Sequence, residues 1–368
     1  MKTTILKDKL TKALQKATRT ISPKSQLPVL QNILLESKKE EITIVASSME
    51  STSVISVSGK TQEEGALCIP AKIFFELINT LTDEQVVLSS DGDTLIVENG
   101  GVKAQIPCIA PAEFPSPPVL KKGKPKDLPK EELVGAVAPV LFCAATDDSR
   151  PVLTGIYIET KEEETVFAAT DGYRLMVKKN RKIAPLEGKL LISSTALSDV
   201  IKTAGEAKEE KMIGVSSSED GQPAFIVGDT TIFTRKIDGD YPAFEKIIPK
   251  THTTQVVVEK ESLEKAVKSA AIFARDNANI VKIHIEEGGI VVSANTPSVG
   301  QNTVHVAGKM EGDGGDIAFN SRFILDYLSN TGGDDVLLEM TGSVNPGVFR
   351  SPGDDSRLHI IMPVRVQA

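Results

Sequence analysis

The feature that most constrains this fold is an internal repeat with a nearly fixed spacing. An alternating apolar stretch that closes on a Glu occurs three times, at 28–36, 151–159 and 279–286. The closing Glu residues lie 123 and then 127 positions apart. A second segment recurs in the same order, at 69–78, 192–201 and 319–328. Ordered matches at nearly constant spacing predict three copies of one domain, and 368 residues are enough for each copy to bury its own core.

Each copy has the same predicted organisation. It opens with an amphipathic helix, expected at 7–19, 130–145 and 259–275, where apolar residues recur at close to helical spacing. Pro139 interrupts the second of these helices and should kink it. Short alternating strands follow, separated by turns rich in Gly, Asn and Asp. A second, shorter helix is expected at 71–81, 194–204 and 321–330. The predicted class is α+β, with two helices packed on antiparallel sheets in each domain.

The joints between the copies are short and polar. They fall near 121–126 and 249–252, which places the three domains at 1–122, 123–252 and 253–368. Joints of this kind are too short to act as flexible linkers, so we expect the domains to hold a fixed arc.

The distribution of charge is uneven. With 42 Lys and Arg against 50 Asp and Glu, the net charge is −8, whereas most nucleic-acid-binding proteins are basic. The six predicted helical stretches nevertheless sum to +4, and the rest of the chain carries −12. The helix at 7–19 alone carries +4, from Lys7, Lys9, Lys12, Lys16 and Arg19 against Asp8. This helix is either a solvated charged face or part of a surface that faces a polyanion.

Several classes of protein are disfavoured. The longest apolar run has 13 residues, too few to span a bilayer, and the N-terminus resembles no signal peptide, so we expect a soluble, cytoplasmic protein with no membrane contact. Cys68, Cys108 and Cys143 lie in apolar settings without C-x-x-C spacing, which favours buried thiols. The four His form no ligand pair, and we expect no metal and no cofactor.

Three motifs within the repeat carry a resemblance to a known family. They are 170–175 (TDGYRL), 238–242 (DGDYP) and 362–366 (MPVRV). In this order they resemble the bacterial beta sliding clamp, the processivity subunit of DNA polymerase III, over essentially the whole chain. The resemblance implies a head-to-tail homodimer that closes into a ring of six domains, with helices lining the hole. Such a ring is non-catalytic: it encircles duplex DNA without reading its sequence and tethers the polymerase.

The resemblance also implies DNA contacts at Lys24 and Lys72, beside the basic helix with Lys9, Lys12, Lys16 and Arg19. Lys24 could equally be a solvated loop cation. This sequence departs from the family pattern at Asp147, Pro151 and Val152, where the family has a Gln and two Tyr. These departures question local DNA contact in the second domain, for which Arg150 could compensate.

A second implied site is a peptide groove between the second and third domains, where linear motifs of partner proteins dock. The partners are the polymerase III catalytic subunit, the clamp loader, and other polymerases and repair proteins. The matching residues are Leu153, Thr170, Gly172, Tyr173, Arg174, Leu175, Pro242, Lys246, Ile247, Val344, Pro346, Ile360, Ile361, Met362, Pro363, Val364 and Arg365. Arg174 and Arg365 could meet acidic groups of the peptide, and the apolar members suit its anchors. Tyr173 and Lys246 replace a common His and Arg. Without the resemblance, Met362 and Pro363 read as a core strand and 170–172 as a plain turn.

The implied dimer contact pairs the third domain of one copy with the first domain of the other. Its matching residues are Ile272 and Phe273 on the third-domain helix and Ile106 on an edge strand of the first domain. Plain core packing is the alternative for Ile272 and Phe273.

Two other functional classes compete with the clamp. An enzyme would use Asp171, Arg174, Asp238 and Asp240, but no nucleophile–base pair or phosphate loop accompanies them. A three-domain scaffold would bind proteins without DNA. Retention on circular DNA distinguishes a clamp from such a scaffold.

Overall fold

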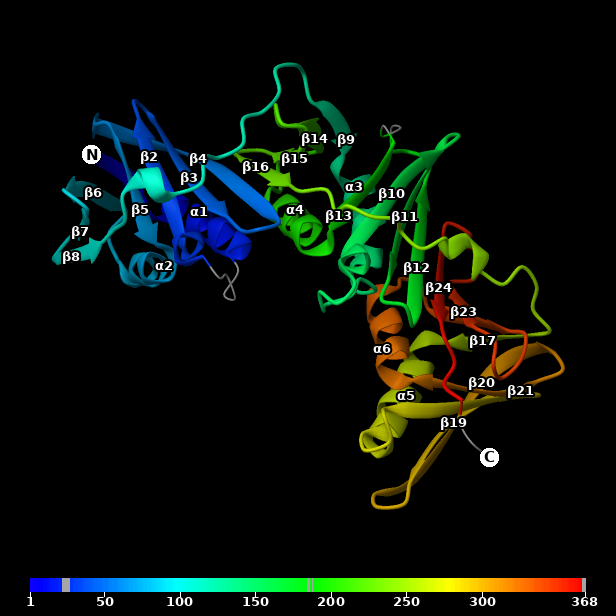
Figure 1. Cartoon of the computed structure of the whole chain (residues 1–368). Helices are drawn as coiled ribbons and strands as arrows, with labels where there is room; N and C mark the ends of the chain where they lie inside the picture. Colours follow the sequence, from blue (N-terminus) through cyan, green and yellow to red (C-terminus); the bar gives the residue numbers. More distant parts are fainter. Residues whose placement is uncertain (22–26, 184–185, 187, 366–368) are drawn as a thin grey trace. The chain divides into compact units, whose positions relative to one another are not determined.

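The computed structural model describes residues 1–21, 27–183, 186 and 188–365 (Figure 1). Across these residues, eight strands and two helices follow one another in the same order three times. This recurrence confirms the threefold repeat and the α+β class predicted from the sequence.

The elements of the first repeat are β1 (Lys2–Leu6), α1 (Lys7–Thr20), β2 (Asn32–Lys38), β3 (Glu41–Ser47), β4 (Ser51–Glu63), β5 (Gly65–Pro70), α2 (Ala71–Thr80), β6 (Gln85–Asp91), β7 (Thr94–Asn99) and β8 (Val102–Pro107). Those of the second are β9 (Lys126–Pro129), α3 (Lys130–Leu141), β10 (Gly155–Lys161), β11 (Glu164–Thr170), β12 (Arg174–Asn180), β13 (Lys189–Ser193), α4 (Ser194–Glu206), β14 (Met212–Ser217), β15 (Pro223–Val227) and β16 (Thr230–Thr234). Those of the third are β17 (Thr254–Glu259), α5 (Lys260–Ala274), β18 (Ile280–Glu286), β19 (Gly289–Thr296), β20 (Gly300–Gly312), β21 (Gly315–Asn320), α6 (Ser321–Asn330), β22 (Asp335–Met340), β23 (Gly347–Arg350) and β24 (Arg357–Ile361).

Apolar periodicity explains how the helices are held. Helix α1 buries Leu10, Ala13, Leu14 and Ala17, which recur every three or four residues and face the sheet. Burial of a Leu side chain stabilises the fold by about 1.5–3 kcal/mol. Helices α1 and α2 contact each other, as do α5 and α6 (Figure 1). The charged side of α1 is therefore left for other contacts.

Helix α3 is shorter than the sequence predicts. It contains Pro139 and ends at Leu141, not near residue 145. Because proline has no N–H, the last turn loses a helical hydrogen bond. The backbone N–H groups of Cys143 and Ala144 then donate to residues three positions earlier, at 3.1 and 3.2 Å, which tightens the chain into a turn.

The chain forms two compact units, each described here by itself. Unit 1 is Met1–Val134 with Thr195–Lys236, and unit 2 is Gly135–Ser194 with Ile237–Ala368. The second repeat contributes to both units.

The sheet of unit 1 runs through two repeats. Its strand order is β8-β7-β6-β1-β4-β16-β15-β14-β9, with β2, β3 and β5 attached through β4. The start of β4 pairs antiparallel with β16, from Ser51 opposite Thr234 to Ile55 opposite Thr230. The first repeat is thus joined to the second by main-chain hydrogen bonds.

The sheet of unit 2 is built in the same way. Its order is β13-β10-β11-β12-β24-β23-β22-β17-β20-β19-β18-β21. The start of β12 pairs antiparallel with β24, from Arg174 opposite Ile361 to Lys178 opposite Arg357. This junction between the second and third repeats pairs equivalent strands in the same antiparallel way as the β4–β16 junction.

The repeat leaves two strand edges open within the described ranges. By position in their repeats, β4, β12 and β20 are equivalent, and so are β8, β16 and β24. Strand β8 ends its sheet and pairs with β7 alone. From Gly300 to Ala307, β20 pairs with β19 on one side, and its pairing with β17 starts only at Gly308. In the described part of the chain, β8 and the start of β20 therefore lack the partners that their equivalents have.

Buried thiols occur as the sequence predicts for Cys68 and Cys143, and Cys108 is half-buried. Desolvation raises the pKa of Cys68 to about 11, so this thiol stays protonated. No helix among the described residues is long and apolar enough to cross a bilayer.

Candidate functional site

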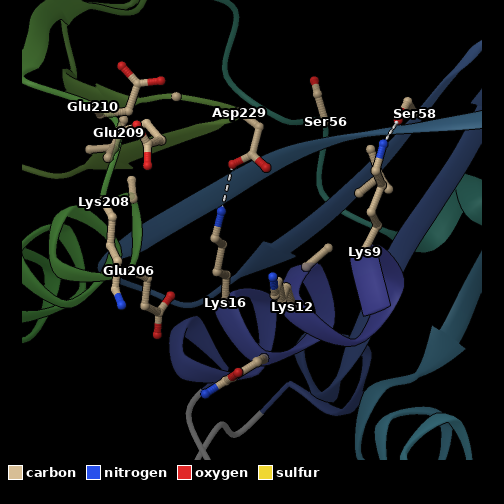
Figure 2. A pocket seen from close by; sticks show the side chains of 16 residues that line it. Lys9, Lys12, Lys16, Ser56, Ser58, Glu206, Lys208, Glu209, Glu210 and Asp229 are labelled. Atoms are coloured by element: carbon tan, nitrogen blue, oxygen red, sulfur yellow. Dashed lines mark hydrogen bonds and ion pairs between the residues drawn. The ribbon is translucent and has the colours of Figure 1, made fainter. Parts of the chain in front are cut away.

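The basic helix α1 lies beside a large cavity in unit 1 (Figure 2). The cavity has a volume of about 1030 Å³. Its walls come from α1, β4, the end of α4 and the β15–β16 turn, through Lys9, Lys12, Ala13, Gln15, Lys16, Ser56, Val57, Ser58, Glu206, Ala207, Lys208, Glu209, Glu210, Val227, Gly228 and Asp229. Both basic and acidic side chains line the cavity.

The lysines of α1 differ in what they bind. Lys9 Nζ donates to Ser58 Oγ at 2.7 Å, while Lys12 is exposed and has no hydrogen-bond or ion-pair partner in the described part of the chain. Lys16 Nζ lies 2.6 Å from Asp229 Oδ1 and 3.1 Å from Thr230 Oγ1. Lys12 is thus the cation of this face most available to an incoming anion.

Arg19 ends the same face in a two-pronged ion pair. Its Nη1 and Nη2 lie 2.6 and 2.9 Å from the two carboxylate oxygens of Glu206. This geometry is the strongest that Arg offers a carboxylate. Of the four α1 cations expected to face DNA, two, Lys16 and Arg19, are therefore already paired with acidic residues of the second repeat.

The remaining DNA-contact candidates are scattered. Lys24 lies outside the described residues. Lys72 is exposed near the start of α2. Arg150 is exposed but donates from Nη2 to the backbone oxygen of Asp171 at 3.1 Å. Its guanidinium comes within 3.0 Å of where a Cβ on Gly172 would stand, so it covers the turn that begins the predicted peptide groove. The positions that depart from the family pattern, Asp147, Pro151 and Val152, lie just before and within the short helix Pro151–Thr154, whose Leu153 is buried.

All residues of the predicted peptide groove belong to unit 2. Leu175 and Ile360 face each other across the β12–β24 pair, and both are fully buried. Phe244 packs in the same cluster. Directly beyond it, the backbone N–H of Met362 donates to the backbone oxygen of Tyr173 at 2.8 Å. The β12–β24 junction therefore forms a firm apolar base.

Apolar side chains stand exposed around this base. Tyr173 and Met362 are 63% and 39% exposed, on the two segments joined by the backbone hydrogen bond. Ile247 follows the short helix Phe244–Lys246 and is 46% exposed, and Val344, in the loop before β23, is 60% exposed. Exposed apolar groups over a buried base are typical of linear-motif docking.

The other candidates form the rim of this surface. Gly172, Pro242, Lys246 and Arg365 are exposed; Pro346, Pro363 and Val364 are half-buried; Leu153, Thr170 and Ile361 are buried. The backbone N–H of Val364 donates to the oxygen of Ala318 at 2.8 Å, which fixes the C-terminal segment on the third repeat.

The turn before β12 is held by its own side chains. Thr170 Oγ1 donates to the backbone oxygen of Arg174 at 2.6 Å and accepts the N–H of Gly172 at 3.0 Å. Asp171 Oδ1 accepts the N–H groups of Tyr173 and Arg174 at 2.9 and 3.0 Å. Gly172 has φ +92°, which side chains rarely adopt. The turn therefore projects Tyr173 in a fixed direction.

From the sequence we expected Arg174 to meet acidic groups of a bound peptide. In the structure its guanidinium is instead bound by other residues of the chain. Its Nε lies 2.9 Å from Asp171 Oδ2 and its Nη1 2.5 Å from Asp326 Oδ2. Nη2 donates to the backbone oxygen of Phe142 at 2.8 Å, and the guanidinium stacks 4.6 Å from the Phe323 ring centre. With 11% of its side chain exposed, Arg174 ties the groove turn to α6 and to the end of α3.

A buried histidine lies next to the residues that surround Arg174. His359 on β24 stacks on Tyr327, with ring centres 5.1 Å apart, and its Nδ1 lies 3.7 Å from Cys143 Sγ. Burial, with the nearby Arg174 charge, lowers the pKa of His359 to about 3, so the ring stays neutral. The same burial raises the pKa of Cys143. The sequence offered no signal for this cluster, because its members lie on separate elements.

The dimer candidates lie near the two open edges. Ile272 on α5 is 53% exposed, and Phe273 is half-buried against the unit 2 core. The Phe273 ring lies 3.7 Å from where a Cβ on Gly300 would stand, at the start of β20. Ile106 lies on β8, but only 4% of its surface is exposed because it packs in the core of unit 1. The exposed part of this region in unit 1 is thus the edge of β8 itself.

No group of three or more His, Cys, Asp or Glu is placed to hold a metal ion in the residues that the structure describes.

Comparison with known proteins accounts for nearly the whole chain. Family models of the DNA polymerase III beta subunit match in order: the N-terminal domain at residues 1–118, the central domain at 127–243 and the C-terminal domain at 245–365.

Individual relatives agree with these matches. The beta sliding clamp of a Synechocystis species is 28% identical over 381 residues, covering 97% of each chain. That of Staphylococcus aureus is 27% identical over 377 residues, covering 99% of each. Among solved structures, the beta subunit from Thermotoga maritima superposes with a TM-score of 0.92 at 25% identity, and the clamp from Bartonella birtlesii, bound to griselimycin, with 0.93 at 23%; both comparisons cover 100% of each chain. The three domain matches, in the order of the observed repeat, show that this chain belongs to the family of the DNA polymerase III beta subunit, the beta sliding clamp.

Proposed function

We propose that two copies of this chain close head to tail into a ring that encircles duplex DNA and tethers the replicative polymerase. The observation that carries this proposal is the pair of open edges, on β8 and at the start of β20. Members of this family are non-catalytic processivity factors. The chain therefore acts by holding its partners and catalyses no reaction.

The junctions inside the chain indicate how a ring would close. Strand β4 pairs with β16, and β12 pairs with β24. The third member of this series is β20 with β8, which are not paired within the described chain, and a second copy would complete it head to tail. Two such contacts in a dimer satisfy both pairs of open edges, which is how a closed assembly removes exposed strand edges.

Side chains near both edges support this interface. Ile272 is exposed on α5, and Phe273 packs beside Gly300 at the start of β20. Ile106 fixes β8 from inside the first repeat. We propose that the edge of β8, which Ile106 holds in place from the core side, meets β20, Ile272 and Phe273 of the other copy.

Enclosure allows weak contacts with DNA. A closed ring cannot leave a circular duplex sideways, so lysines need only screened, non-specific phosphate contacts that permit sliding. Exposed Lys12 and Lys72 suit this role, whereas Lys16 and Arg19 are paired. We assign to the DNA-facing surface the cations Lys9, Lys12, Lys16, Arg19, Lys24 and Lys72. Arg150 would join them only after its guanidinium moves off Gly172.

The surface around the β12–β24 junction is proposed as the partner groove. Exposed apolar side chains stand over its buried base, from Tyr173, Ile247, Val344 and Met362. Arg365 is exposed and takes no part in the contacts around Arg174. Peptide motifs of the polymerase III catalytic subunit, the clamp loader and other polymerases and repair proteins would dock there. Tethering then raises the effective concentration of a polymerase at the primer end.

The domain limits that we propose are 1–122, 123–252 and 253–368, and we place the protein in the cytoplasm, where replication occurs.

Retention on circular DNA tests the function. A clamp loader should place the protein on nicked circular plasmid, where it should survive a high-salt wash and leave once the circle is cut. Equal loss from circles and linear fragments at that salt would indicate plain electrostatic adhesion. A protein that binds partner peptides but never remains on the circle would be a scaffold.

A further inference from the structure

The ion pairs of α1 present their negative partners to solvent. The Lys16 side chain is 13% exposed, while Asp229 is 54% exposed. The Arg19 side chain is 18% exposed, while Glu206 is 40% exposed. An anion that approaches this part of unit 1 therefore meets carboxylates before it meets the two cations.

The cavity strengthens this effect. Glu209 and Glu210 line it together with Glu206 and Asp229, and among the described residues of that wall Lys208 is the one cation (Figure 2). On the α1 side, Lys9 donates to a neutral Ser58 and Lys12 has no partner within the described ranges. Carboxylates thus occupy the places where phosphates would bind Lys16 and Arg19.

We propose that Asp229 and Glu206 are internal competitors of DNA phosphate, which set how strongly α1 holds DNA. The inference rests on the proposed function, because it takes α1 to face DNA. A phosphate that binds Lys16 or Arg19 competes with a carboxylate that already binds the cation, so each such interaction with DNA is weakened. This weakening favours a clamp that must slide.

Removing a competitor should strengthen DNA binding. Asp229→Asn keeps the shape and an acceptor oxygen for Lys16 but removes the charge. Because an exposed ion pair contributes about 1 kcal/mol or less, we expect affinity for duplex DNA to rise by about twofold to fivefold for Asp229→Asn or Glu206→Gln. One additional phosphate bound by Lys16 or Arg19 should also steepen the dependence of log affinity on log salt by about 0.9.

The experiment measures fluorescence anisotropy of a short labelled duplex against the full-length protein over a series of salt concentrations. Its matched control is Glu36→Gln, which removes the same charge from another ion pair of unit 1, with Lys38 at 3.5 Å. Thermal melting and gel filtration check that each variant stays folded and keeps the oligomeric state of the wild type. The Asp229→Asn change is repeated in a Lys16→Ala background.

The outcomes are distinct. The inference predicts a rise in affinity for Asp229→Asn that exceeds the rise for Glu36→Gln and disappears when Lys16 is absent. An equal rise in all three cases would mean a general charge effect and would overturn it. If Lys12→Ala weakens binding but Asp229→Asn and Glu206→Gln change nothing, α1 faces DNA and only the competition is refuted. If Lys12→Ala also has no effect, the DNA-facing assignment of α1 fails and the inference with it.

Discussion

The backbone N–H of Met362 donates to the backbone oxygen of Tyr173 at 2.8 Å, just past the β12–β24 pair. The same bond recurs one repeat earlier, from Arg235 to Glu50 at 2.9 Å, just past the β4–β16 pair. At the later junction the two residues joined by this bond are Tyr173 and Met362, whose apolar side chains are exposed, whereas at the earlier one they are Glu50 and Arg235. The two junctions thus share a backbone frame, and the peptide groove that we propose lies at the later one.

Deletion of the chain from Val364 onward should abolish binding of a polymerase-tail peptide and leave the dimer intact. The deletion removes the backbone bond from Val364 to Ala318, which holds Met362 and Pro363 in place, and it removes Arg365. Isothermal titration with a peptide carrying Gln and Leu/Phe anchors measures the loss, and sedimentation measures the dimer. Unchanged peptide affinity would refute the groove assignment.

Ile272→Glu should convert the dimer into monomers. The side chain is 53% exposed, so the fold tolerates the charge, whereas a buried charge in an interface with β8 would be costly. Phe273→Glu should do the same but with some loss of stability, because Phe273 packs on the core. Light scattering after gel filtration measures the mass at low protein concentration.

Val344→Glu is the matched control for that experiment. It places the same charge on a side chain that is 60% exposed, in the loop before β23 and on neither of the two open strands. A dimer that survives Ile272→Glu, or monomers that also form with Val344→Glu, would contradict the proposed interface.

The sequence predicted the repeat and the helices well because their signals are local. In α1, Leu10 and Leu14 recur at helical spacing, and the helix runs from Lys7 to Thr20, one residue beyond the predicted end. The predicted end of the second long helix near residue 145 was wrong, because α3 contains Pro139 and ends at Leu141. The groove residues were proposed through the resemblance; of its motifs, 170–175 leads into β12 and the last begins directly after β24.

What the sequence could not reveal depends on contacts between distant segments. Lys16 and Asp229 are 213 positions apart, so nothing near either residue signals that this pair neutralises one lysine of the basic helix. Arg174 reads as a free cation in its motif, yet Asp326, 152 positions away, binds it. Burial of the charged group in each case follows from tertiary packing alone.

Asp199→Asn should stabilise the protein at neutral pH. Burial on α4 raises the pKa of Asp199 to about 6, despite the opposing charges of Arg19 and Lys202. A carboxyl with a raised pKa binds its proton more tightly in the folded state, so stability falls as pH rises from about 4 to about 6 and stays lower above. The variant lacks this loss and should gain about 1–3 kcal/mol above pH ~7.

Denaturant unfolding at several pH values measures this effect. Near pH ~4 the wild type and Asp199→Asn should differ little, because the carboxyl is then protonated in the folded state. Glu36→Gln, a change at a carboxylate that is 33% exposed, is the control for removing a carboxylate elsewhere in unit 1. A constant difference between Asp199→Asn and wild type at every pH would contradict the titration and indicate a packing effect.

Arg174→Lys should destabilise unit 2 and weaken peptide binding together. Lysine keeps the positive charge but cannot bind Asp171, Asp326 and the Phe142 carbonyl at once, nor stack flat on Phe323. Removing donors from the Asp171 carboxylate, which is 17% exposed, and from the Phe142 carbonyl should cost about 1–3 kcal/mol. Arg181→Lys, at an ion-paired side chain that is 82% exposed, should change little. Because Arg174 holds the turn that projects Tyr173, and its guanidinium is bound by Asp171, Asp326 and the Phe142 carbonyl, its loss should lower peptide affinity even under conditions where the variant is fully folded. If affinity stayed at the wild-type value in the folded variant, Arg174 would have a purely structural role, unconnected with the groove.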